Sequence, residues 1–186
     1  MRSNEVKKGF DRAPHRSLLR ATGQIQNDDD FSKPFIGIAN SYIDLIPGHV
    51  HLQEFGKVAK QAIRNAGGIP FDFNTIGVDD GIAMGHPGMK SSLVSREVIA
   101  DSVELTVRGH CYDAIVGVAG CDKSLPGLMM VMARLNLPSI FMYGGSILPG
   151  KFKGKQVTVQ DLFEAVGEYA SGKICLLYTS PSPRDS

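Results

Sequence analysis

Apolar positions along the chain recur with two different periods, and the changes of period predict where strands give way to helices. Short, mostly apolar runs are typical of buried strands and occur at 34–40, 69–73 continuing through 76–78, 114–120 and 139–145. Apolar residues three or four positions apart predict helices over 49–66, about 95–107, 128–135, and from the cap Thr158 to Gly172. The remaining N-terminal residues, 1–33, are interpreted as an arm that precedes the domain.

Strands and helices therefore alternate along the chain, and the strand interiors are almost entirely apolar. This combination predicts an α/β fold, with a mostly parallel sheet covered by helices on both faces. In open sheets of this kind, ligands bind beyond the carboxyl ends of the strands. Small or ligand-capable residues follow all four predicted strands: Asn40-Ser41, Asp79-Asp80-Gly81, Cys121-Asp122-Lys123 and Gly144-Gly145-Ser146. We expect them to meet at one crevice.

Two of these clusters carry groups that suit metal ions. The turn GCDKSLPG places the thiol of Cys121, the carboxylate of Asp122 and the amine of Lys123 on consecutive residues. A thiolate suits iron and a carboxylate suits magnesium, so Cys121 could bind one centre while its neighbours face another. The structural alternative is a small buried cysteine, a helix-capping aspartate and a solvated lysine. Asp79 and Asp80 either share a cation or form an ordinary Asp-Gly turn.

The histidines are expected to be structural rather than catalytic. His49 and His51 are two positions apart and would point to different sides of a helix, so we expect hydrogen bonding at the helix start rather than a shared metal. His86, His110 and Cys111 are likewise interpreted as structural.

Composition narrows the class of protein. The 186 residues include 20 Lys and Arg against 19 Asp and Glu, a balance that argues against a broad nucleic-acid surface. No apolar run has the length of a membrane span or a secretion signal, so a cytoplasmic location and no membrane partner are expected. Three cysteines are too few for a disulfide framework. Phosphate-binding GxxxxGK[ST], GxGxxG and GxSxG motifs do not occur.

The last residues, 175–186, read CLLYTSPSPRDS and change abruptly in composition. A reverse translation of CLLYTS resembles the mosaic end of a transposase-built sequencing library. We interpret this tail as a non-native scar, with the native protein continuing beyond Ile174; a natural Pro/Ser-rich tail is the alternative.

Several long blocks together carry a resemblance to a known family. They are NSYIDLIPGHVHL, FNTIGVDDGIAMGHPGMKSSLVSREVIADSVE, GCDKSLPG and MARLNLPSIFMYGGSILPGK. In this order they resemble the dihydroxy-acid dehydratase family, which also includes sugar-acid dehydratases. The resemblance extends from residue 2 to residue 174. The block VDDGIAMGH is similar to the dihydroxy-acid branch. The resemblance implies that 34–174 is the truncated N-terminal α/β domain of a larger two-domain enzyme.

The resemblance also implies cofactors and roles. Cys121 would ligate an iron–sulfur cluster, either 2Fe-2S or 4Fe-4S, while Asp80 and Asp122 would bind Mg²⁺. Lys123 matches a family lysine that reacts with CO₂ to form a carbamate, and partial burial is expected to favour this by lowering its pKa. The family's catalytic base, a further Mg²⁺-binding glutamate and another cluster cysteine lie in the C-terminal part, so no catalytic residue is expected in this fragment, which would be inactive alone.

One departure from the family affects the cluster. Many relatives have a cysteine where this chain has Gly48, so the type of cluster is left open. One possibility is a four-iron cluster. The other is a two-iron cluster with a substitute ligand, for which Cys111 is a candidate. The implied enzyme is a hydro-lyase that converts small 2,3-dihydroxy carboxylic acids to 2-oxo acids in valine and isoleucine biosynthesis. The resemblance also implies that the full-length enzyme is a homodimer. The alternatives are a sugar-acid dehydratase and a noncatalytic α/β binding module.

Overall fold

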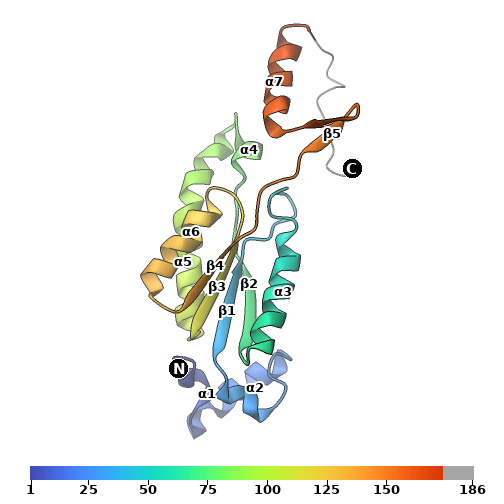
Figure 1. The fold of residues 1–186 in the computed structure, drawn as a ribbon. Coiled ribbons are helices and arrows are strands. Elements are labelled where there is room, and N and C mark those ends of the chain that lie inside the picture. The colour runs from blue at the N-terminus through green and yellow to red at the C-terminus, as the bar shows by residue number, and fades with distance from the viewer. Residues whose placement is uncertain (174–186) are drawn as a thin grey trace. The chain divides into compact units, whose positions relative to one another are not determined.

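Four parallel strands form the central sheet (Figure 1). They pair in the order β2-β1-β3-β4, with bounds β1 Phe35–Asn40, β2 Ile69–Asn74, β3 Ala114–Ala119 and β4 Ser139–Tyr143. Asn40 at the end of β1 pairs with Asn74 on one side and Val118 on the other. The carboxyl ends of the strands are therefore level with one another along one edge of the sheet.

Helices cover both faces of this sheet. Helix α3 (Leu52–Asn65) lies on one face, while α5 (Lys90–Gly109) and α6 (Ser124–Leu135) pack together on the other (Figure 1). Side chains alternate between the two cores: Ile38 and Val118 pack towards α3, and Phe35 and Ile115 pack towards α5 and α6. The predicted α/β class and the parallel sheet are confirmed.

The computed structural model describes residues 1–173, and they fall into two compact units, residues 1–145 and a second unit that begins at Ser146. The remaining elements of the first unit are α1 Asn4–Lys7, η1 Phe10–Arg12, α2 Ala13–Ala21, η2 Asp28–Ser32, α4 Asp80–Ala83 and η3 Pro87–Met89. The second unit contains the antiparallel pair β5 Gly150–Phe152 and β6 Lys155–Val157, followed by α7 Val159–Ala170. The interpretation of 175–186 as a scar concerns residues outside the described part.

Several predicted boundaries differ from the structure. Helix α5 begins at Lys90 rather than near residue 95, because its first turns carry serines and the exposed Leu93 and Val94, which hide the apolar period. The second strand ends at Asn74, and half-exposed Ile76 lies beyond the sheet. The arm predicted over 1–33 contains short helices that its weak apolar pattern did not indicate. No helix within residues 1–173 combines the length and apolar character needed to cross a bilayer.

The order of the strands creates a switch point between β1 and β3. The chain leaves β1 towards α3 on one face, and it leaves the neighbouring β3 towards α6 on the opposite face. The two connections therefore separate at the carboxyl end of adjacent strands. Ligand crevices in open α/β sheets occur at such points.

Candidate functional site

The segments that follow the four strands are joined to one another at the carboxyl edge. The Ser41 N–H donates to the carbonyl of Val118 at 2.9 Å, and the Gly120 N–H donates to Ser41 Oγ at 3.3 Å. On the other side of β3, the Gly144 N–H donates to the carbonyl of Ala119 at 2.7 Å. These bonds fix the start of each connection before its functional side chains are reached.

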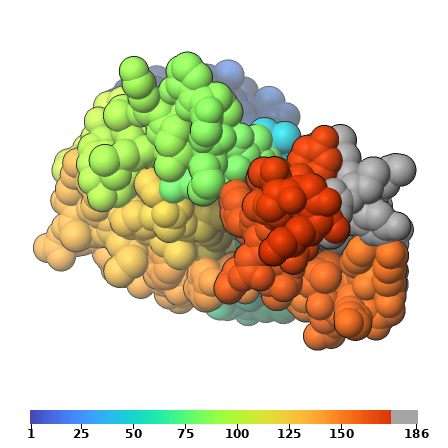
Figure 2. Space-filling view, turned by 90° about the horizontal axis from the view of Figure 1, so that it is seen from above, coloured from blue at the N-terminus to red at the C-terminus, as the bar shows by residue number. Residues whose placement is uncertain are grey.

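Lys123 joins the connections that follow β2 and β3. Its Nζ lies 2.7 Å from Oδ2 of Asp80 and 2.7 Å from Oδ2 of Asp122. The lysine side chain is 16% exposed and that of Asp80 is 22% exposed, whereas that of Asp122 is 69% exposed. Seen from above, the green atoms that follow β2 border the yellow atoms that follow β3 (Figure 2). Three of the residues that the sequence singled out thus form one charged cluster.

Asp80 is held in its charged form within this cluster. Burial by itself raises the pKa of Asp80, but hydrogen bonds from Lys123 and from the Ser92 hydroxyl outweigh it and lower that pKa overall. Ser92 is almost fully buried on the first turn of α5. The early start of α5 therefore supplies a contact to Asp80 that the sequence analysis did not identify.

The expected lowering of the Lys123 pKa is wrong for the chain in this state. Hydrogen bonds to Asp122 and Asp80 raise the pKa of Lys123 and outweigh the opposing effect of burial. The amine is therefore a paired ammonium at neutral pH. Only the neutral amine attacks CO₂, so carbamate formation requires proton loss from this pair.

Cys121 lies at the turn between β3 and α6 in a left-handed backbone conformation, with φ of 58°. Such a conformation is uncommon for a residue other than glycine and concentrates at functional sites. Burial, reinforced by the negative charges of Asp79, Asp122 and Asp80, raises the pKa of the Cys121 thiol to about 11. The free thiol is therefore protonated at neutral pH and poorly suited to act as a nucleophile. A ligand role would require a bound metal to displace that proton, because the thiolate is the form that binds metals.

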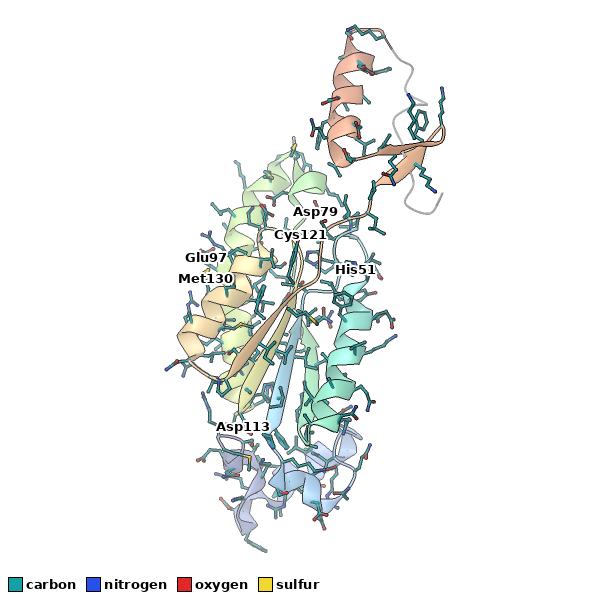
Figure 3. All side chains as sticks on the ribbon, viewed as in Figure 1. His51, Asp79, Glu97, Asp113, Cys121 and Met130 are labelled. Atoms are coloured by element: carbon teal, nitrogen blue, oxygen red, sulfur yellow. The ribbon has the colours of Figure 1, made fainter. Side chains whose placement is uncertain are left out.

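Asp79 has a local structural role. Its Oδ1 accepts a hydrogen bond from the Ile82 N–H at 3.1 Å, which caps the short helix α4. Its carboxylate lies at the same edge of the sheet as Cys121 (Figure 3). Of the two adjacent aspartates, Asp80 is the one that contacts Lys123.

The histidines do not stabilise the helix start in the way expected from the sequence. His51 stands at the N-cap of α3 but makes no capping hydrogen bond, and its Nε2 lies 2.6 Å from the carbonyl of Gly144. His49 is fully buried, and its Nδ1 contacts the carbonyl of Ser41. Both rings thus bind backbone that follows a strand. Helical periodicity alone could not indicate this, because the partners lie on other segments.

Cys111 cannot share a metal centre with Cys121. It precedes β3, whereas Cys121 follows β3, so the six-residue strand separates them by on the order of 20 Å. Its candidacy as the substitute cluster ligand is therefore wrong. The structural interpretation of Cys111 is consistent with its position at the end of α5.

The donor types at the carboxyl edge fit two different metals, although within residues 1–173 no three His, Cys, Asp or Glu side chains are gathered as a ready-made metal site. Asp80 and Asp122 already converge on one cation, the Lys123 ammonium. Oxygen donors of this kind suit Mg²⁺, and the thiol of Cys121 suits iron. The fully buried His49 also has an Nε2 with no hydrogen-bond partner among these residues. Hard and soft donors are therefore both present at the switch point.

A comparison with protein families agrees with this architecture. The family model described as dihydroxy-acid/6-phosphogluconate dehydratase N-terminal matches residues 33–177. The match takes in most of the chain, with all four strands of the sheet and the connections that carry Asp80, Cys121 and Lys123. The chain therefore belongs to the dihydroxy-acid/6-phosphogluconate dehydratase family and represents an N-terminal portion of it.

Proposed function

We propose that this chain is the metal-binding N-terminal part of a dihydroxy-acid dehydratase, a hydro-lyase of valine and isoleucine biosynthesis. The observation that carries the proposal is the cluster in which Lys123 is held between Asp80 and Asp122, next to Cys121 at the switch point. The substrate class is a small 2,3-dihydroxy carboxylic acid. Elimination removes a proton from C2 and the hydroxyl from C3, which together make up the one molecule of water released, and the resulting enol tautomerises to a 2-oxo acid.

Cys121 would hold an iron–sulfur cluster, and Asp80, Asp122 and the carbamate of Lys123 would hold Mg²⁺. When bound, these groups supply Lewis acidity to the leaving hydroxyl and to the carboxylate of the substrate. Carbamate formation joins the neutral Lys123 nitrogen to CO₂ and releases a proton. The lysine thereby changes from a cation to an anion between two carboxylates. That change makes a divalent cation necessary in the place where the ammonium now balances the charge.

The chain's own residues position the oxygen donors. Ser92 donates to one oxygen of Asp80 and thereby leaves the other oxygen to face Lys123. Asp122, which is more exposed, is free to adjust when the cation is exchanged. The base that removes the C2 proton is expected in a C-terminal part, so the 186-residue chain is expected to be inactive alone.

The dihydroxy-acid branch is preferred because the block VDDGIAMGH, which contains Asp80, is similar to that branch of the family. We further propose that 175–186 is not native, that the native protein continues after Ile174, and that the full-length enzyme is a cytoplasmic homodimer. The alternatives are a sugar-acid dehydratase of the same family and a noncatalytic binding module.

The test begins with the uninterrupted source gene and the full-length enzyme, purified without oxygen. We expect it to dehydrate 2,3-dihydroxy-isovalerate in preference to aldonates. Cys121→Ser should abolish the visible absorbance of the cluster, whereas the matched control Cys111→Ser should retain it, because Cys111 lies at the opposite end of β3.

Lys123→Arg should lower Mg²⁺-dependent turnover by on the order of 100-fold and leave that absorbance intact, because a guanidinium forms no carbamate. Lys90→Arg on α5 serves as the matched control and should be unaffected. Preferred turnover of aldonates would favour the sugar-acid alternative. A reading frame that stops after this domain, with no turnover of either substrate, would favour the binding module.

A further inference from the structure

His49 is the one histidine of the site whose ring is completely enclosed. It has no exposed surface, and it lies in the connection between β1 and α3, at the switch point. Its Nδ1 contacts the Ser41 carbonyl, and a carbonyl oxygen can only accept a hydrogen bond. Nδ1 therefore carries the proton of the neutral ring. Nε2 is left with a lone pair directed into the protein.

That lone pair has no hydrogen-bond partner among residues 1–173. Buried polar atoms in native proteins are almost always satisfied, so an exception requires an explanation. The arrangement of His49 matches that of metal-binding histidines, which commonly donate the proton of one ring nitrogen to a backbone carbonyl and use the other nitrogen as the ligand.

The ring also lies directly against the turn that carries Cys121. A Cβ added to Gly120 would lie 3.4 Å from Nε2 of His49, 3.3 Å from its Cδ2 and 2.7 Å from the carbonyl oxygen of Gly48. Only a residue without a side chain allows this approach. The unpaired nitrogen is thus brought next to the residue that immediately precedes the thiol.

His51 provides an internal comparison within the same segment. Its Nε2 lies 2.6 Å from the Gly144 carbonyl, so in a neutral ring Nε2 carries the proton and cannot act as a ligand. The carboxylates of Asp80 and Asp122 are both engaged with Lys123. Of these groups, Nε2 of His49 is the one left without a hydrogen-bond partner in the part of the chain that the structure describes.

We propose that Nε2 of His49 is a metal ligand that acts together with the thiolate of Cys121. This inference rests on the proposed function, because it assigns a second protein ligand to the same iron centre. It also separates two kinds of centre at one edge of the sheet: a sulfur and nitrogen pair for iron, and oxygen donors for Mg²⁺.

The first test needs neither a variant nor a metal. The reduced 186-residue chain, labelled with ¹⁵N-histidine, is examined by long-range ¹H–¹⁵N correlation at neutral pH. We expect His49 to carry its proton on Nδ1, with the resonance of an unprotonated nitrogen at Nε2, and His51 to show the opposite tautomer. A proton on Nε2 of His49 would overturn the inference.

The second test uses Co²⁺ alone as the probe, since its thiolate charge-transfer absorption reports sulfur ligation. The chain should show this band, and Cys121→Ser should abolish it. His49→Gln should raise the Kd for Co²⁺ by on the order of 100-fold, whereas the matched control His51→Gln should stay within about threefold. Circular dichroism checks that each variant is folded.

Two results of the cobalt titration would refute the inference: no thiolate band in the wild-type chain, or an unchanged Kd in folded His49→Gln. Neither test measures turnover. A full-length enzyme that lacks dehydratase activity, with His49 still binding Co²⁺ beside Cys121, would refute the proposed function and leave this inference standing.

Discussion

The close approach at Gly120 makes the effect of a single methyl group predictable. In Gly120→Ala, the new Cβ would lie 2.7 Å from the carbonyl oxygen of Gly48, closer than such atoms approach in real proteins. The obstacle is backbone, which cannot rotate away as a flexible side chain can, and the His49 ring lies only 3.3 Å from the same position. The segment that contains Gly48 and His49 must therefore shift by a few tenths of an ångström.

Overpacking of this kind costs about 1–3 kcal/mol of folding free energy. With a urea m-value of roughly 2 kcal/mol/M, a loss of about 2 kcal/mol lowers the unfolding midpoint by about 1 M. For a chain of this length, Tm should fall by about 4–8 °C. Urea and thermal unfolding followed by circular dichroism measure both quantities. Co²⁺ binding by His49 should weaken in the same variant, because the ring is displaced.

Gly109→Ala is the matched control, since a Cβ at Gly109, at the end of α5, would meet no atom of residues 1–173 within 4 Å. Its stability should be unchanged or increase by about 0.5–1 kcal/mol, because alanine restricts the unfolded chain. The reasoning fails if Gly120→Ala unfolds within about 0.5 kcal/mol of the wild-type chain, a difference typical of ordinary surface substitutions.

Three further predictions concern the packing around the sheet. Asp113 accepts hydrogen bonds from Ser3 and from the Phe35 N–H. Burial raises the pKa of Asp113, but these hydrogen bonds outweigh burial and lower that pKa overall. Asp113→Ala should therefore lower the free energy of unfolding in urea by about 1–3 kcal/mol. Because the pKa of Asp113 is lower in the folded chain, its stabilising effect should be present above the ordinary pKa of 3.8 and disappear as the pH falls through the folded value. If the wild-type chain and Asp113→Ala lost stability equally in acid, this prediction would be contradicted. Burial raises the pKa of Tyr112 from 10.0 to about 12, so ultraviolet titration should resolve a late ionisation that is lost in Tyr112→Phe. The contribution of Tyr112 to stability should decline as the pH rises between these two values, and ionisation of Tyr112 near 10 would exclude the effect. Gly127→Ala would place a Cβ 2.9 Å from a backbone oxygen of α5. This overpacking should lower the free energy of unfolding by about 1–3 kcal/mol and therefore lower Tm. An unchanged Tm would show that α5 and α6 can separate freely.

Much of the fold could be predicted from short sequence patterns, because they depend on residues that are close together along the chain. The runs that form β1 and β3 are short and almost entirely apolar, as expected for strands buried on both faces of a parallel sheet, so length and composition together predict them. The predicted cap of the last helix is also present, because Thr158 and Asp161 form a capping box three residues apart. The prediction was weaker at the start of α5, where exposed Leu93 and Val94 give no periodic signal.

The candidate site could likewise be predicted only in part. Asp80, Asp122 and Lys123 were identified from their residue types and the family resemblance, and the structure brings them together. The direction of the Lys123 pKa was predicted wrongly, because it depends on which partners the amine meets rather than on how deeply it is buried. Whether these residues bind Mg²⁺ stays a prediction.

The sequence by itself determined the alternation of strands and helices, and the set of ligand-capable residues after each strand, because both depend on near neighbours along the chain. Tertiary structure alone decided that Nε2 of His49, beside Gly120, finds no hydrogen-bond partner among residues 1–173, and that Lys123 meets Asp80 from another connection. The physical reason is that hydrogen-bond partners, burial and charge depend on segments far apart in the sequence. Parallel pairing of β1 with β3 brings such segments together, and the pattern of either segment alone does not contain that information.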